Sequence, residues 1–235
     1  ENSLAGVRIG NPLSVQEWEA MLTELVSRNA GIDQAVYLQV TRGVAAKRDH
    51  AFPADTRPTL FAMSTPMATA VDIDAITGTA AITLPDIRWK HCNIKAITLL
   101  PNVLLRQQAV DSGAAEAILI KDGHVIEGAA SNVFTVTGGM LQTPPNSPAL
   151  LPGITRDLIL ELAARHAIPF RETDITTAEL LAADEVWLTS STREISPVTR
   201  LDDTVISAGK PGPLWQRMIS LYQDYKTAIR SGAAD

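Results

Sequence analysis

The sequence contains a single cysteine, Cys92, among 235 residues. One cysteine excludes a disulfide bond within the chain and argues against a metal cage built from thiolates. This scarcity fits a reducing compartment, so we expect a cytoplasmic protein. The four histidines lack the spacing of metal ligands, with one another and with Cys92, and we therefore expect no metal site.

An excess of basic residues and long apolar runs are also absent. The 20 Lys and Arg residues are outnumbered by 26 Asp and Glu residues, which gives a net charge of -6. This balance gives no reason to expect nucleic acid or an anionic membrane as a partner. No apolar run is long enough to cross a bilayer. The sequence also lacks a glycine-rich nucleotide loop and the nucleophile elbow of serine hydrolases.

The composition that remains is that of a globular protein with a substantial core. Hydrophobic residues make up 46% of the chain and charged residues 20%, an ordinary mixture without a signature of disorder. The length fits one large domain or two modest ones. We place a junction within Pro66–Asp74, which predicts domains at residues 1–70 and 71–235.

The first domain is expected to contain a helix and two strands. The opening residues look like the end of a helix that runs into a turn at Asn11-Pro12. Ser14 and Glu17 form a capping-box pattern, which predicts a helix that ends near residues 29–31. Alternating β-prone residues then predict strands over residues 35–41 and 59–65.

The second domain is expected to mix hairpins with helices. Asp122-Gly123 and Gly138-Gly139 lie where tight turns would join antiparallel strands. The patterns predict strands at 79–87 and 185–190, hairpins at 116–128 and 132–144, and helices at 101–112, 153–166 and 211–229. We therefore expect an α+β fold with hairpin-linked antiparallel strands rather than a series of βαβ units.

Five short patterns are candidates for chemistry, and each has an ordinary structural explanation. Lys95 lies in an apolar run that would disfavour its ammonium form and free its amine for a Schiff base, although a snorkelling lysine is common in such a place. Glu127 is flanked by small residues that leave room for a flat group, yet an acid near a turn is also common.

The other three patterns are suited to anions. Gly153, Ile154 and Thr155 begin a helix, where free amides and the helix dipole bind anions, though most helix starts bind nothing. The hydroxyl cluster Thr189–Thr192 fits a phosphate cup or a plain turn between strands. Arg48 and His50, two residues apart, would point the same way in an extended chain and could clamp a carboxylate, or they are solvated loop residues.

Together, and in this order, these patterns resemble the class IV aminotransferases. The segments that carry the resemblance are "IKAITLLPNVLLRQQAVDSGAAEAILIKDGHVIEGAASNVFTV", "LLPGITRDLILELA" and "AADEVWLTSSTREISPV". The resemblance implies the two-domain fold type IV and pyridoxal 5′-phosphate (PLP) as cofactor. Residues 1–70 would be the remainder of the small N-terminal domain, because "ENSLAGVRI" resembles a position inside it, and residues 71–235 would be the large PLP-binding domain.

The resemblance also implies roles for single residues. Lys95 matches the catalytic lysine that binds the cofactor covalently, and Glu127 matches the acid that pairs with the pyridine nitrogen. Ile154 and Thr155 match the phosphate cup at a helix start, and Ser191 and Thr192 match a second phosphate-binding loop.

The subfamily follows from the "VTRG" and "RDHAFP" segments, which resemble D-amino-acid aminotransferases. Arg48 and His50 match the pair that binds the substrate carboxylate in the neighbouring subunit, so the resemblance implies a homodimer. It also implies D-amino acids as donors and 2-oxoglutarate or pyruvate as acceptor. Arg193 stands where a small hydroxyl residue is often found. The alternatives are an aminodeoxychorismate lyase, a branched-chain aminotransferase, and a truncated chain without activity.

Overall fold

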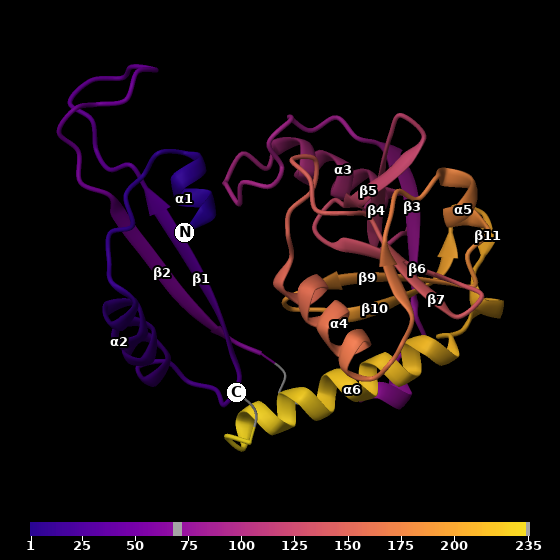
Figure 1. Cartoon of the computed structure of the whole chain (residues 1–235). Coiled ribbons are helices and arrows are strands. Elements are labelled where there is room, and N and C mark those ends of the chain that lie inside the picture. Colours follow the sequence, from indigo (N-terminus) through magenta and orange to yellow (C-terminus); the bar gives the residue numbers. More distant parts are fainter. Residues whose placement is uncertain (68–71, 234–235) are drawn as a thin grey trace. The chain divides into compact units, whose positions relative to one another are not determined.

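The computed structural model describes residues 1–67 and 72–233, and its chain divides into two compact units (Figure 1). We call Glu1–Asp72 the small unit and Ile73–Asp235 the large unit. The junction predicted within Pro66–Asp74 includes residues 68–71, which lie outside the described residues.

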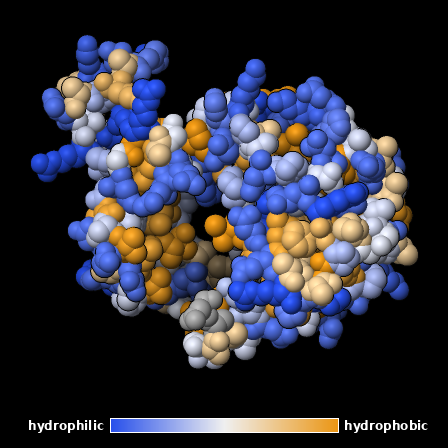
Figure 2. All heavy atoms as spheres, in the orientation of Figure 1, coloured by the Kyte–Doolittle hydropathy of each residue, from blue (hydrophilic) through white to orange (hydrophobic). Residues whose placement is uncertain are grey.

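The described residues of the small unit form two helices and a two-stranded antiparallel sheet. Helix α1 (Asn2–Gly6) precedes α2 (Val15–Ser27), and β1 (Gln34–Thr41) pairs with β2 (Thr59–Pro66). The predicted capping box is confirmed, because Ser14 Oγ accepts from the Glu17 amide while the Glu17 carboxylate accepts from the Ser14 amide. The small unit leaves apolar side chains exposed on its surface (Figure 2), among them Leu38, Phe61 and Met63.

The large unit is built around a mixed sheet. Its described strands follow the order β5-β4-β3-β10-β9-β6-β7-β8, and β11 pairs with β10. The strands are β3 (Thr79–Pro85), β4 (Glu116–Lys121), β5 (His124–Gly128), β6 (Asn132–Thr137), β7 (Met140–Thr143), β8 (Phe170–Glu172), β9 (Glu185–Ser190), β10 (Glu194–Leu201) and β11 (Thr204–Val205). The helices are η1 (Ile73–Ala75), α3 (Leu100–Asp111), α4 (Ile154–Arg165), α5 (Thr177–Leu181), η2 (Ser207–Gly209) and α6 (Pro213–Arg230).

The two predicted hairpins are confirmed, and the described strands also include a βαβ unit, although not a series of such units. Antiparallel pairs β4–β5 and β6–β7 turn at the predicted glycines. Strands β3 and β4, however, are parallel neighbours and are connected through α3. A parallel connection needs a crossover, and the long segment between these strands supplies one. Strand β10 also runs parallel to β3.

Helices α4 and α6 lie together against the sheet (Figure 1) and bury its largest hydrophobic cluster. Trp187 of β9 and Trp215 of α6 are both almost fully buried in this cluster, beside Phe134 of β6. On α3, Leu105 and Ala109 pack with Leu119 of β4 in a separate cluster. Because these helices are held by buried apolar faces, the residues at their first turns have fixed positions.

Candidate active site

A cavity of about 510 Å³ lies in the large unit where four elements begin or end. Its walls come from the segment before α3 and α3 itself, the end of β5 with the turn that follows, the start of α4, and the end of β9. This volume falls in the range of pockets that bind small molecules and cofactors. The cavity therefore forms where the sequence motifs of the large unit converge.

Most of the predicted site residues of the large unit line this cavity, namely Lys95, Glu127, Ile154, Thr155 and Ser191. Thr192 is not among the lining residues, whereas Thr189 and Ser190, which precede the predicted pair, are. Arg48 and His50 belong to the small unit, where both are exposed in the connection between β1 and β2.

Glu127 is held by donors on both carboxylate oxygens. Its Oε2 accepts from the Leu151 amide at 3.1 Å and from Asn132 Nδ2 at 3.3 Å, while Oε1 pairs with Arg88 Nη1. The Arg88 guanidinium in turn binds Asp86, with Nη2 at 2.9 Å from Oδ2. These contacts leave the Glu127 carboxylate little freedom to rotate.

Sequence reasoning missed Arg88. Its side chain is only 3% exposed and bridges Asp86 and Glu127, which makes it the centre of a buried ion-pair chain. The available signal was an aspartate and an arginine two residues apart, seven residues before Lys95. That pattern alone does not show which distant carboxylate forms the second ion pair with the arginine.

Burial raises the pKa of Glu127 to about 7, although the positive charge of Arg88 and the hydrogen bonds to the carboxylate oppose the shift. The ordinary pKa of this group is 4.5. Between pH 4.5 and about 7, Glu127 of the cofactor-free protein therefore keeps its proton in the folded state and loses it in the unfolded state. This contribution to stability is complete below pH 4.5 and is lost as the pH rises through about 7.

We expect Glu127→Gln to remove this pH dependence. Relative to the variant, the free energy of unfolding of the cofactor-free protein should fall by about 3 kcal/mol between pH 4.5 and pH 8. Urea unfolding of both proteins at these two pH values measures the difference. Equal pH dependence in the two proteins would contradict the burial cost assigned to Glu127.

The first turn of α4, at Gly153, Ile154 and Thr155, brings the positive end of the helix dipole to the cavity wall, and we call it the anion pole. Gly153 is the N-cap in extended conformation, and the first amides of the helix have no carbonyl partners within it. A Cβ on Gly153 would lie 2.1 Å from Asn132 Oδ1. Asn132 cannot move away easily, because its Nδ2 donates to Leu151 O and to Glu127. Glycine is therefore required here for close packing.

We expect Gly153→Ala to destabilise the protein by about 1–3 kcal/mol, because the new methyl group would overlap the buried side chain of Asn132. Urea unfolding measures this loss. Gly10→Ala is the matched control, since a Cβ there meets nothing within 4 Å. A Gly153→Ala variant as stable as the control would show that Asn132 has room to move.

Lys95 lies in the irregular segment between β3 and α3 and is exposed in the cavity. From the sequence, Lys95 could be an amine among apolar neighbours or a lysine that snorkels to water. Ile97 and Leu99, which follow Lys95, are themselves exposed, so the run is not buried. The segment is tied down at Pro148, whose carbonyl accepts from the Cys92 amide at 2.8 Å.

The turn after β9 completes the cavity wall with hydroxyl groups. Ser190 Oγ accepts from the Arg193 amide at 3.3 Å, which closes the turn. Thr189 is 1% exposed, and its Oγ1 has no hydrogen-bond partner among the described residues. A buried hydroxyl without a protein partner is unusual, and Thr189 lines the cavity, so its hydroxyl is placed where a ligand could bind it.

Comparison with known proteins matches these features to one family. The sequence profile described as amino-transferase class IV matches residues 1–201. The chain belongs to the class IV aminotransferases. Aminotransferases of this class use PLP, and the predicted cofactor is thereby confirmed.

Alignments with relatives and with solved structures cover most of this chain. The D-alanine aminotransferase of Bacillus licheniformis is 40% identical over 222 residues, which cover 94% of this chain and 78% of the relative. The D-alanine aminotransferase of Listeria innocua is 39% identical over 215 residues, covering 90% and 74%. The crystal structure of the branched-chain aminotransferase of the archaeon Thermoproteus uzoniensis with norvaline has a TM-score of 0.81 at 25% identity, covering 99% of this chain and 76% of that one.

The residues present fit PLP. The cavity brings together an amine, a buried carboxylate and a helix start with free amides, which suit the aldehyde, the ring nitrogen and the phosphate. The unsatisfied Thr189 hydroxyl, orphaned among the described residues, is a further donor in the same wall. Lys95, Glu127, and Ile154 with Thr155 would hold the three parts of the cofactor.

A metal centre and a membrane-spanning helix are both missing from the described part of this class IV aminotransferase. No three His, Cys, Asp or Glu side chains within residues 1–67 and 72–233 are grouped so as to hold a metal ion. The helices of those residues are too short or too polar to cross a membrane.

Proposed function

We propose that this protein transfers the amino group of a D-amino acid to a 2-oxo acid, with 2-oxoglutarate or pyruvate as acceptor. The observation that carries the proposal is the convergence of Lys95, Glu127 and the anion pole of α4 on one cavity. The chain belongs to the class IV aminotransferases, and the D-alanine aminotransferases of two bacteria are about 40% identical to it.

The chemistry divides between cofactor and protein. Bound PLP supplies an electron sink for the pair left when the substrate loses its Cα proton. With the cofactor bound, Lys95 would take that proton with its amine and pass it back to the bound substrate, because its amine lines the cavity. Glu127 holds a proton at the ring nitrogen, and Arg88 with Asn132 fixes the direction in which this carboxylate points.

The small unit supplies the proposed substrate-binding pair. Arg48 and His50 are exposed and separated by Asp49, whose Oδ1 accepts from the His50 and Ala51 amides and bends the chain. We propose that they bind the substrate carboxylate in the cavity of a second subunit, so that the enzyme works as a homodimer in the cytoplasm. An arginine offers two parallel donors to a carboxylate.

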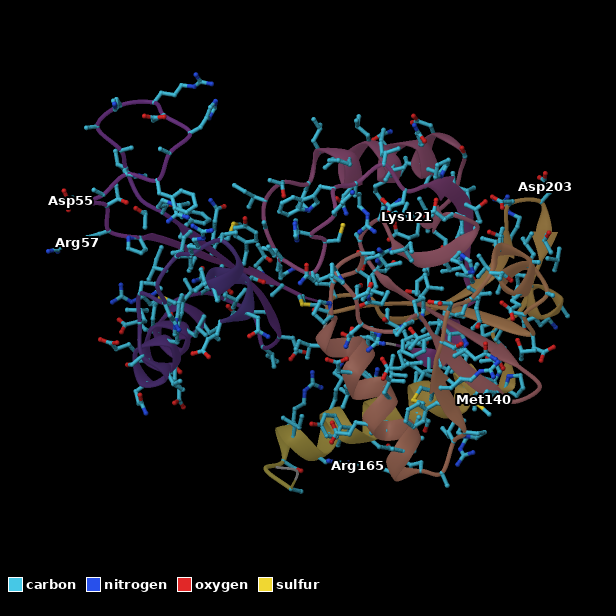
Figure 3. All side chains as sticks on the ribbon, turned by 45° about the horizontal axis from the view of Figure 1, so that its top comes forward. Asp55, Arg57, Lys121, Met140, Arg165 and Asp203 are labelled. Atoms are coloured by element: carbon cyan, nitrogen blue, oxygen red, sulfur yellow. The ribbon has the colours of Figure 1, made fainter. Side chains whose placement is uncertain are left out.

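The proposal is tested by the formation of pyruvate from D-alanine and 2-oxoglutarate, with L-alanine in parallel. Pyruvate formed faster from D-alanine supports the D-specific reaction, whereas a preference for L-alanine would overturn it. Arg48→Ala should raise KM for D-alanine. Its matched control is Arg57→Ala, because Arg57 extends into solvent from the same connection (Figure 3).

A further inference from the structure

Arg193 follows the hydroxyl residues of the turn after β9. Its side chain is partly exposed and forms an ion pair. Arg193 Nη2 donates to Glu116 Oε2 at 2.6 Å, across 77 positions of sequence. A charge-assisted hydrogen bond of this length is stronger than one between neutral groups.

Glu116 is the first residue of β4 and is fully buried. A buried carboxylate needs donors, and Glu116 has several. Its Oε1 accepts from the Ala117 amide at 3.2 Å and lies 3.9 Å from Arg106 Nε, while its Oε2 also accepts from Ser131 Oγ at 3.3 Å. The carboxylate is therefore a fixed point to which Arg193 is attached.

Two guanidinium groups share this one carboxylate, so the cluster of Arg106, Glu116 and Arg193 keeps one net positive charge. Arg106 and Ser131 also line the cavity, as do Ser190 and Ser191. The cluster thus adds positive potential to the wall that contains the hydroxyl groups of the turn.

The other end of the turn is anchored independently. Glu194 has a φ of 53°, a left-handed conformation that is uncommon for a residue other than glycine, asparagine or aspartate. Its carboxylate accepts from Gln223 and Lys226 of α6. The turn is consequently held between β4 on one side, through Arg193, and α6 on the other, through Glu194.

The position of this turn matters because it lies next to the anion pole. Thr189 pairs with Asn132 across β9 and β6, and Asn132 contacts Gly153 at the start of α4. Ser190 and Ser191 extend directly from Thr189. The turn and the α4 amides thus form two neighbouring parts of one anion-binding wall.

We propose that Arg193 is a positioning residue that ties the turn bearing Ser190 and Ser191 to Glu116 and thereby sets the affinity of the cavity for the phosphate group of PLP. The proposal rests on PLP as the cofactor and not on the choice of D-amino acids. The contribution of Arg193 to cofactor affinity should depend on the phosphate group, because Arg193 acts through the turn that bears the hydroxyl groups of the anion-binding wall.

The test compares PLP with pyridoxal, which has the same ring and aldehyde but no phosphate. Dissociation constants of both are measured by absorbance with cofactor-free wild type and with Arg193→Ser. We expect Arg193→Ser to weaken PLP on the order of tenfold and to leave pyridoxal nearly unchanged. A ratio of the two constants that rises at least about fivefold supports the proposal, and any smaller rise overturns it.

Two further variants make the result specific. Arg193→Lys keeps a cation near Glu116 and should restore part of the PLP affinity; equal loss in both variants would contradict an ionic tether. It also serves as the test variant if Arg193→Ser does not fold.

Arg200→Ser is the matched control, because Arg200 is exposed on β10 and donates only to the Asp202 carbonyl among the contacts described. Failure of wild type to bind PLP would instead refute the cofactor assignment.

Discussion

Lys95→Ala is expected to abolish transamination and covalent binding of the cofactor together. The alanine has no amine to bind the aldehyde and none to move the Cα proton, so the rate should fall at least about 1,000-fold. The visible absorption band of the bound cofactor should disappear. Pyruvate formation from D-alanine and an absorption spectrum of the same sample measure the two effects.

Lys90→Ala is the control for this variant. Lys90 is exposed in the same segment, five residues earlier, and it does not line the cavity. It should keep both activity and the absorption band. A Lys95→Ala protein that retains the band, or a Lys90→Ala protein that loses it, would show that the catalytic lysine is assigned to the wrong residue.

Glu127→Gln is expected to have the second largest effect on activity. The amide has nearly the shape of the carboxylate but carries no negative charge, so it cannot hold a proton at the ring nitrogen of the cofactor. Loss of this charge-assisted hydrogen bond should lower kcat about 100-fold. KM should change little, because Glu127 is only 5% exposed in the cavity wall and is proposed to contact only the cofactor.

Steady-state kinetics of Glu127→Gln and Glu161→Gln separate this role from a general effect of removing an acid. Glu161 is exposed on α4 and pairs with Arg165 one turn later. An exposed pair of this kind contributes little to stability, so the control should behave as wild type. A Glu127→Gln enzyme with wild-type kcat would exclude Glu127 as the partner of the ring nitrogen.

Local rules account for the parts of the fold that the sequence predicted well. The Ser14 capping box, the turns at Asp122-Gly123 and Gly138-Gly139, and Pro101 in the first turn of α3 each depend on residues within a few positions of one another. Such signals are visible in a single sequence. The short elements β8, β11 and α5 have too few residues to give a periodic pattern, and they were not predicted.

The parts that were missed depend on contacts between distant residues. Nothing near Arg88 in sequence shows that its guanidinium meets Glu127, and nothing near Arg193 shows that it meets Glu116. The exposure of Lys95 likewise depends on how its segment lies against Pro148. In each case the contact is set by how distant segments pack together, and the resemblance to the class, rather than local chemistry, is what led to the predicted catalytic residues.

The central claim is that Lys95 binds PLP in the cavity of the large unit. Its most direct test is reduction of the PLP-loaded protein with borohydride, followed by digestion and mass spectrometry of the labelled peptide. We predict a single phosphopyridoxyl group on Lys95. A label on another lysine, such as Lys90 or Lys121, or no label on a protein that has been incubated with PLP, would contradict the account.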